Sequence, residues 1–290
     1  MDVSVITVTY NSSAYISECL ASIRAQEGVK AEIVAVDNAS ADGTAALVRG
    51  LEADVQLLVN RDNVGFGRAC NQGFAASRGR FIFLLNPDAR LVGRDALARL
   101  CRALQDHPRW GMAGTLVLST EGRDFPPHTT YPGQVRSRND FSRLPGAIAW
   151  VLGASMFVRR EVYDALGGFD PDFFLYSEEI EFCLRLRKLG HEIGFVDSVE
   201  VRHIGGATEQ ERDPYDVWMQ RMHGLYLFWK KHYLPEDVTR LVRHDRFRSI
   251  RRIVGYGLLS LLKSRGSPAW RNLRQWQAIR KAASVFLEQA

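Results

Sequence analysis

Apolar runs alternate with helix-like segments through the first 118 residues of the chain. The runs are short and almost wholly aliphatic or aromatic, and they occupy residues 3–8, 31–36, 55–59, 80–85 and 111–118. Runs of this length without polar alternation are typical of strands that are buried on both faces. The segments between them have helical character and occupy residues 13–27, 42–51, 65–77 and 94–106. This alternation predicts an α/β fold with a mostly parallel central sheet and helices on both faces.

The pattern changes after residue 118. Residues 119–146 hold four of the ten prolines and show no sustained period, which is usual for a functional or disordered loop. A strand that leads into a helix is predicted over 147–166, and another strand over 199–202. The remainder is predicted to be helical and is rich in Trp, Arg and Leu. We therefore expect one domain over 1–212 and a basic, amphipathic helical region over 213–290.

The apolar run at 81–85 ends abruptly in Asn86-Pro87-Asp88. Proline supplies no N–H to a strand ladder and biases the preceding residue toward extended backbone, so Asp88 should lie just past the strand end. In open α/β sheets, ligands bind at this edge. An ordinary turn is the other interpretation, because all three residues are common in turns.

The other strand ends are polar as well. Thr9-Tyr10-Asn11 follows the first strand in place of the glycine-rich turn that a dinucleotide fold requires, which argues against an NAD enzyme. Asp37 ends the second strand, where it could accept hydrogen bonds from a base or ribose, although a helix N-cap by Ser40 or Asp42 would also explain this turn.

The loop after the third strand carries glycines and arginines. Gly65 and Gly67 permit a close backbone approach, and Arg61 and Arg68 could contact phosphate, although glycine is also common at helix starts. The carboxyl ends of these strands meet at one edge of the predicted sheet. We therefore expect the polar loops and Asp88 to converge there.

Five segments in this order resemble the inverting glycosyltransferase family 2, which has the GT-A fold. They are VSVITVTYNS, VDNASADGT, NVGFGRACNQG, FLLNPDA and GGFDPDFFLYSEEIEFCLRLRKLG. The resemblance covers about residues 3–208 and is greatest to rhamnosyltransferase-like bacterial members that build cell-surface polysaccharides. It implies transfer of a sugar, L-rhamnose from dTDP-rhamnose or another dTDP- or UDP-sugar, to a saccharide acceptor of O-antigen or capsule synthesis.

The resemblance also implies roles for individual residues. The nucleotide sugar would be bound by Thr9, Tyr10, Asn11, Asp37, Asn38, Arg61, Asn63, Gly65, Asn86 and Asp88. Asp88 matches the last position of the family's D-x-D motif and would bind a divalent cation, Mg²⁺ or Mn²⁺. The first Asp of that motif is Asn86 here, which removes one anionic ligand. His203 follows a predicted strand and would be a second metal ligand, although a lone histidine is more often structural.

The segment that contains Glu178 and Glu179 resembles the family's Glu-Asp pair. Glu179 would be the catalytic base that takes a proton from the acceptor hydroxyl, with Glu178 as the alternative base and an acceptor contact. Without the resemblance, the two glutamates could also be acids that only complement the dipole at the start of a helix. Trp150, Gly153 and Ala154 would line the acceptor cleft, although Trp in a strand is more often core.

Charge is divided unevenly along the chain. Residues 221–290 hold 15 Lys and Arg against 4 Asp and Glu, whereas residues 1–220 hold 23 against 29. In the helical region, apolar runs flanked by basic residues are typical of helices that lie on an anionic membrane surface. The same pattern is equally typical of an amphipathic helix that packs by its apolar face and exposes its basic face to solvent. Nucleic acid is not expected as a partner, because no recognition module accompanies the charge.

The four cysteines are widely spaced, the N-terminus carries no basic leader, and no apolar run reaches the length of a membrane span. We expect a cytoplasmic chain, peripheral on the inner face of the cytoplasmic membrane. Two other functions stay open. A sugar nucleotidyltransferase would need a Gly- and Arg-rich loop after the first strand, and a non-catalytic carbohydrate- or membrane-binding protein would keep the fold without transfer.

Overall fold

The computed structural model describes residues 1–51, 54–205, 212–260 and 264–289. These residues form two compact units. The first unit contains Met1–Tyr131, Arg143–Phe174 and residues 178–205. The second contains Pro132–Ser142, Leu175–Ser177 and the helices after residue 212. Parts of the irregular segment at 119–146 therefore belong to each unit.

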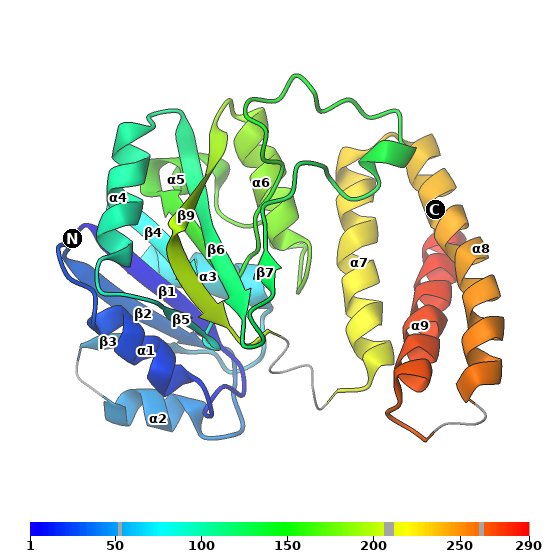
Figure 1. Cartoon of the computed structure of the whole chain (residues 1–290), viewed down its shortest axis with the longest axis horizontal. Coiled ribbons are helices and arrows are strands. Elements are labelled where there is room, and N and C mark those ends of the chain that lie inside the picture. The colour runs from blue at the N-terminus through cyan, green and yellow to red at the C-terminus, as the bar shows by residue number, and fades with distance from the viewer. Residues whose placement is uncertain (52–53, 206–211, 261–263, 290) are drawn as a thin grey trace. The chain divides into compact units, whose positions relative to one another are not determined.

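A mixed sheet forms the centre of the first unit (Figure 1). Its strands are β1 (Val3–Thr9), β2 (Ala31–Asp37), β3 (Val55–Val59), β4 (Phe81–Leu85), β5 (Ala89–Leu91), β6 (Trp110–Ser119), β7 (Asp124–Phe125), β8 (Ser155–Arg159) and β9 (Glu192–His203). They are ordered β3-β2-β1-β4-β8-β6-β9-β5, with β7 paired to β6. The strands from β3 to β4 are parallel. Beyond β4 the sheet is mixed, because β8 runs antiparallel to β4 and β6 while β6 and β9 are parallel.

Helices cover both faces of this sheet. They are α1 (Ile16–Arg24), α2 (Thr44–Leu51), α3 (Phe66–Ala76), α4 (Ala96–Asp106), α5 (Arg160–Leu166) and α6 (Glu178–Lys188). Side chains of α1, α2 and α4 pack on one face, and those of α3, α5 and α6 pack on the other. Strand β4 serves both cores, since Phe81, Phe83 and Leu85 point to the first and Ile82 and Leu84 to the second. Because both of its faces are buried, this strand shows no polar alternation.

The predicted elements agree closely with the structure. The predicted strand at 55–59 has the same bounds as β3. Strands β1, β2 and β4 differ from their predicted bounds by one residue at one end, and β6 is longer than predicted by one residue at each end. The predicted helix at 13–27 is shorter at both ends in α1, whose buried residues Ile16, Cys19, Leu20 and Ile23 follow the helical period. After the end of β6 at Ser119, the irregular segment contains β7, an isolated β-bridge at His128 and a 3₁₀ turn at Gln134–Arg136. The four cysteines are buried free thiols.

The second unit is built around three helices, α7 (Pro214–His232), α8 (Pro235–Ser260) and α9 (Pro268–Gln289). Asp213 caps α7 by accepting a hydrogen bond from the Tyr215 amide at 2.8 Å, and it also pairs with Arg274 of α9 at 2.8 Å. Trp229 and Tyr233 each donate a hydrogen bond of 2.8 Å to the Pro132 carbonyl. These bonds attach the segment at 132–142 to the helices.

A pair of glycine substitutions tests the packing of β1 on β4. A Cβ on Gly79 would lie 2.6 Å from both the Ser4 hydroxyl and the Val3 carbonyl carbon, so Gly79→Ala should destabilise the fold by about 1–3 kcal/mol. Gly50 lies in α2 with nothing within 4 Å of such a Cβ, so Gly50→Ala should stabilise by roughly 0.5–1 kcal/mol. Urea unfolding of both variants measures the two effects. Equal stabilities for the variants would contradict the packing described.

Candidate active site

The ends of β1 and β2 are joined by a buried side-chain hydrogen bond. Thr9 and Asp37 are register partners, and the Thr9 hydroxyl donates to Asp37 Oδ1 at 2.9 Å. The Ser40 amide donates to the other carboxylate oxygen, Oδ2, at 3.1 Å. Asp37 is 1% exposed, and each of its oxygens accepts a hydrogen bond from the protein itself. The structure thus fixes this carboxylate at the strand end, where the sequence predicts nucleotide contacts.

The neighbouring loops are connected through asparagines. Asn38 Nδ2 donates to Asn63 Oδ1 at 2.8 Å, and the Gly65 amide donates to the same oxygen at 3.0 Å. Asn11 Oδ1 accepts from the Ala41 amide at 2.8 Å and so joins the first loop to the second. Asn38 and Asn63 therefore hold the shape of the loop after β3. Sequence reasoning assigned them to the ligand alone and missed this network.

Gly65 is required by the protein's own backbone. Its φ is +91°, and a Cβ there would lie 2.5 Å from the Phe174 carbonyl oxygen. The Phe66 amide also donates to that oxygen at 2.9 Å. Arg68 donates to the Pro171 carbonyl at 2.8 Å. Tyr10 and Arg61, by contrast, are exposed at this edge of the sheet. The close approach predicted at Gly65 is thus made by the chain itself.

The segment after β4 is a turn, and it brings Asp88 to His203. The Ala89 amide donates to the Asn86 carbonyl at 3.0 Å, which closes the turn. Ala89 and His203 are antiparallel partners in β5 and β9. As a result, Asp88 Oδ1 lies 3.2 Å from His203 Nε2, and Asn86 Nδ2 lies 3.4 Å from the same nitrogen. The turn and the strand-end interpretations of Asn86-Pro87-Asp88 are therefore both correct.

The Asp88 and His203 pair has the donor chemistry of a partial metal site. Among the residues that the structure describes, no group of three or more His, Cys, Asp and Glu side chains could hold a metal ion. One carboxylate oxygen and one imidazole nitrogen suit Mn²⁺, and the carboxylate also suits Mg²⁺. Among the described residues, the buried Nδ1 of His203 has no hydrogen-bond partner, whereas its Nε2 faces the Asp88 carboxylate. The residues fit a cation that takes its other ligands from phosphate and water.

Two adjacent carboxylates begin α6 in different surroundings. Glu178 is 5% exposed, and its buried Oε2 has no hydrogen-bond partner among the residues that the structure describes. Burial, and secondarily the charge of Glu179, raises the pKa of Glu178 well above its ordinary value. Glu179 is half-buried and lies beside Gly153, where an added Cβ would be 3.4 Å from the Glu179 Cβ. Only Glu179 is therefore both reachable and placed next to a predicted acceptor residue.

Backbone strain precedes this helix. Tyr176 and Ser177 both have φ of 71°, in the left-handed region that non-glycine residues rarely adopt. Two consecutive residues of this kind cost on the order of 1–3 kcal/mol each. Such strain is concentrated at functional sites, where the surrounding structure maintains it. The helix start that carries the two glutamates is consequently set by an unusual local conformation.

Trp150 lies outside the named strands and stacks on a residue that sequence reasoning missed. The rings of His128 and Trp150 are 3.7 Å apart and nearly parallel, at 6°. The Trp150 indole donates to the Thr130 carbonyl at 3.2 Å. His128 and Trp150 also form an isolated antiparallel β-bridge through their backbones. Burial lowers the pKa of His128. No local pattern indicates this pairing, because His128 and Trp150 are 22 residues apart along the chain.

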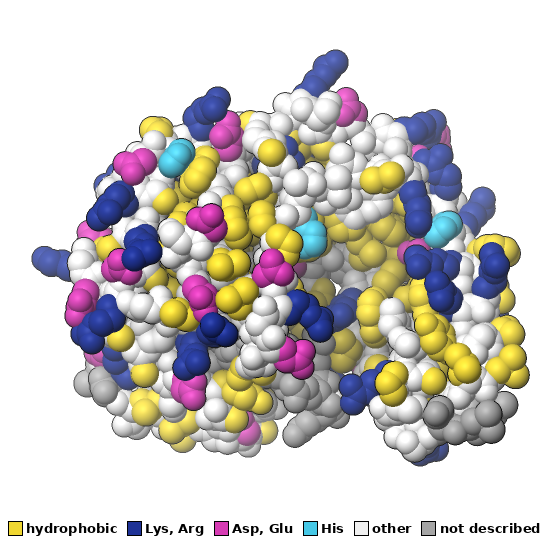
Figure 2. All heavy atoms as spheres, viewed as in Figure 1, with side chains coloured by type: hydrophobic (Ala, Val, Ile, Leu, Met, Phe, Trp, Pro, Cys, Tyr) yellow, Lys and Arg dark blue, Asp and Glu magenta, His cyan; other side chains and the backbone are white. Residues whose placement is uncertain are grey.

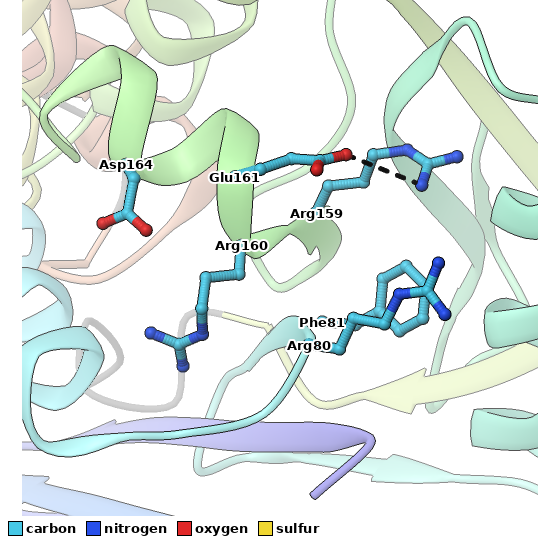
Figure 3. A pocket seen from close by; sticks show the side chains of 6 residues that line it. All are labelled: Arg80, Phe81, Arg159, Arg160, Glu161 and Asp164. Carbon is cyan, nitrogen blue, oxygen red and sulfur yellow. Dashed lines mark ion pairs between the residues drawn. The ribbon is translucent and has the colours of Figure 1, made fainter.

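A surface pocket of about 290 Å³ lies at the opposite end of β4 (Figure 3). It is lined by Arg80, Phe81, Arg159, Arg160, Glu161 and Asp164. Arg159 donates to the Trp110 carbonyl and Arg160 to the Ser77 hydroxyl, both at 2.8 Å. Two of the three arginines thus serve the protein's own polar groups. The pocket has no part in the predicted site.

Residues 4–167 match the family model described as glycosyl transferase family 2. The chain belongs to this family. It is 27% identical over 255 residues to N-acetylglucosaminyl-diphospho-decaprenol L-rhamnosyltransferase of Mycobacterium tuberculosis, covering 77% of this chain and 82% of that protein. It is 43% identical over 191 residues to the succinoglycan biosynthesis protein ExoO of Rhizobium meliloti, covering 64% of this chain and 52% of that one. The predicted family and its rhamnosyltransferase-like character are confirmed.

The fold of this glycosyltransferase is shared with a solved mannosyltransferase, PcManGT from Pyrobaculum calidifontis in complex with GDP-Man and Mn²⁺. The TM-score is 0.59 at 20% sequence identity, over 99% of this chain and 74% of that one. The likeness confirms the predicted GT-A fold. The roles of the individual site residues stay predictions.

The buried carboxyl of Glu178 predicts a pH-dependent stability. The folded protein retains this proton above pH 4.5, the ordinary value for glutamate, whereas the unfolded chain releases it. Stability therefore falls as the pH rises from about 4.5 toward the raised pKa, by roughly 1 kcal/mol per pH unit. Glu178→Gln removes this loss, so the variant should gain stability relative to the wild type with rising pH. Thermal melts from pH 4 to 8 measure the difference.

Glu288→Gln on the exposed surface of α9 is the matched control, because it makes the same change of charge without burial. A Glu178→Gln variant that loses stability relative to the wild type as the pH rises would show that Glu178 is ionised in the folded protein.

Proposed function

We propose that this family 2 member is an inverting glycosyltransferase that moves a sugar from a nucleotide-activated donor to a saccharide acceptor. The arrangement at the edge of the sheet supports this most directly. Thr9 and Asp37 end the neighbouring strands β1 and β2, and Asp88 follows the adjacent strand β4 and contacts His203 at the end of β9. The first pair suits a base or ribose and the second a diphosphate with its cation. A nucleotide sugar contains both parts.

The relatives support a particular donor and acceptor. The mycobacterial relative is named for transfer of L-rhamnose to a lipid-diphosphate saccharide, and the Rhizobium relative for succinoglycan synthesis. We accordingly propose dTDP-rhamnose, or another dTDP- or UDP-sugar, as the donor. The proposed acceptor is a saccharide of cell-surface polysaccharide synthesis such as O-antigen or capsule, and it is linked to a lipid diphosphate.

The chemistry needs a base on the acceptor side and charge stabilisation on the donor side. In a single displacement the acceptor hydroxyl attacks the anomeric carbon, gives its proton to a carboxylate, and releases the nucleoside diphosphate. Glu179 is the proposed base. Glu178 is unsuited to this role, because a buried, protonated carboxyl has no free site for another proton and no access to the acceptor.

The donor side is assigned to residues at the ends of β4 and β9. Asp88 and His203 would hold Mg²⁺ or Mn²⁺, whose positive charge would favour departure of the diphosphate. Asn86 Nδ2 lies 3.4 Å from the same imidazole nitrogen and so borders the pair. Asp37 orients the nucleoside, while exposed Arg61 and Tyr10 are available to the remaining donor groups. Trp150, Gly153 and Ala154 are proposed to line the acceptor side.

We also propose a division of labour along the chain. Residues 1–212 form the catalytic GT-A domain, and residues 213–290 form a basic helical region that attaches the enzyme to the inner face of the cytoplasmic membrane. In the described part of the chain, no helix is long and apolar enough to cross a membrane. A peripheral attachment fits a soluble nucleotide donor and a lipid-linked acceptor.

Ligand-induced stabilisation tests the donor assignment. A ligand bound only by the folded protein at 100 times its Kd stabilises it by about 2.7 kcal/mol, which raises Tm by several degrees. We expect dTDP-rhamnose or a UDP-sugar to do so with Mg²⁺ or Mn²⁺ present. Asp88→Asn should abolish the metal-dependent part of the rise in Tm. Asp106→Asn, which changes an exposed side chain at the end of α4, should keep it. The donor assignment fails if no nucleotide sugar raises Tm with either cation.

Paired glutamate variants test the catalytic assignment. Glu179→Gln should lower kcat by about 10²–10⁴ because no carboxylate takes the acceptor proton, while its donor-induced rise in Tm stays intact. Glu178→Gln should keep most of the activity, because an amide replaces a neutral acid of the same shape. Transfer of radiolabelled sugar measures both. Loss of transfer in Glu178→Gln alone would assign the base to Glu178, and full activity in both variants would indicate a non-catalytic protein.

A further inference from the structure

Helix α8 carries a stripe of exposed apolar side chains. Phe247, Ile250, Val254 and Leu258 are spaced by three or four residues and therefore lie on one face of the helix. Their exposed fractions are 64%, 41%, 62% and 66%. These four residues are called the α8 stripe below. Scattered exposed apolar residues are ordinary on protein surfaces, but a continuous row of four large ones indicates an interaction surface.

The α8 stripe does not pack the helical unit together. The packed side of α8 holds the buried residues Val238, Leu241, Val242 and Ser249, and α9 contributes the buried residues Ala278, Ile279, Ala282 and Ala283. By position on the helix, the α8 stripe lies on the side opposite these contacts. Figure 2 shows yellow hydrophobic side chains beside dark-blue Lys and Arg side chains on these helices. The exposed stripe must therefore have another partner.

The charge around the stripe identifies that partner. Arg243, Arg246 and Arg251 are exposed at its edges, and no Asp or Glu occurs from residue 246 to residue 260. Two further arginines of α8 are already engaged, since Arg248 and Arg252 stack on Trp276 at 5.1 and 5.7 Å. An apolar row with cations along its sides is complementary to a bilayer interface, where acyl chains lie beneath anionic phosphates.

A second copy of the chain fits this surface less well. In a symmetric dimer the same patch contacts itself, so the arginines at the edges of one α8 stripe would face those of the other. Like charges facing each other across an apolar contact oppose association. An anionic lipid surface satisfies the apolar residues and the arginines together.

We propose that α8 lies in the plane of an anionic membrane interface, with the α8 stripe in the acyl boundary and Arg243, Arg246 and Arg251 on lipid phosphates. This inference rests on the proposed function and deepens it, because it names the surface that would hold the enzyme beside a lipid-linked acceptor. It adds to that function the specific helix face and the lipid charge that the face recognises.

Co-sedimentation of the full chain with vesicles tests the inference. Vesicles of phosphatidylglycerol with phosphatidylcholine should bind the protein, and vesicles of phosphatidylcholine alone should not. Val254→Asp should weaken binding by about tenfold or more, because a charge enters the acyl boundary. Val135→Asp is the matched control, since Val135 is 88% exposed in the same unit but lies outside α8. It should bind as the wild type does.

Arginine variants test the charge requirement separately. Each change of Arg243, Arg246 or Arg251 to Gln should weaken binding by about fivefold, and added salt should reduce the difference. Circular dichroism and the donor-induced rise in Tm serve as independent measures of folding and of the donor site. The inference is overturned if phosphatidylglycerol vesicles bind no wild-type protein, or if Val254→Asp binds as well as Val135→Asp. It is also overturned if Val254→Asp only converts a dimer to a monomer.

These outcomes are separable from failure of the proposed function. A protein that is stabilised by a nucleotide sugar but ignores vesicles would keep its donor site and lose only the membrane surface. A protein that binds anionic vesicles through α8 but is stabilised by no nucleotide sugar would keep the membrane surface and lose the proposed function.

Discussion

The pairing of β4 with β1 on one side and β8 on the other is the constraint on which the site depends. Parallel pairing with β1 places Asn86-Pro87-Asp88 at the same edge as Thr9 and Asp37. Antiparallel pairing with β8 continues past the strand end, where the Asn86 amide donates to the Ala154 carbonyl at 3.1 Å. The preceding residue, Gly153, lies against Glu179. One strand thus fixes both the position of Asp88 and that of the proposed base.

Burial, more than residue type, distinguishes the two glutamates of α6. Both are carboxylic acids at the start of one helix, where the helix dipole favours negative charge by about 0.3–1 kcal/mol. Removing a carboxylate from water costs far more than this, so burial raises the pKa of Glu178 well above its ordinary value. Of the other two acids in the first turn, Glu181 pairs with Arg185, and Glu179 is half-buried beside Gly153. Glu179 is therefore the acid of this turn that lies against a predicted acceptor residue.

Local pattern predicted the strands and the fold class well, because a strand buried on both faces, such as β4, carries its signal in consecutive residues. It could not predict that β8 lies between β4 and β6, since that order depends on pairing between residues far apart along the chain. The same limit applies to the site. The position of Asp88 follows from Pro87, but the contact with His203 joins residues 115 positions apart and was suggested only by family resemblance. The asparagine network and the His128–Trp150 stack have no local signal at all.

The C-terminal helices show why sequence left packing and membrane contact equally open. In α8 apolar residues occur on two sides of the helix, so periodicity alone cannot assign a core face. Packing against the small residues Ala278, Ala282 and Ala283 of α9 decides which side is buried. The side left exposed is the α8 stripe, and stacking on Trp276 separates the structural arginines from those at its edges. The packing interpretation is therefore confirmed for one face of this helix, and membrane contact by the other face stays a prediction.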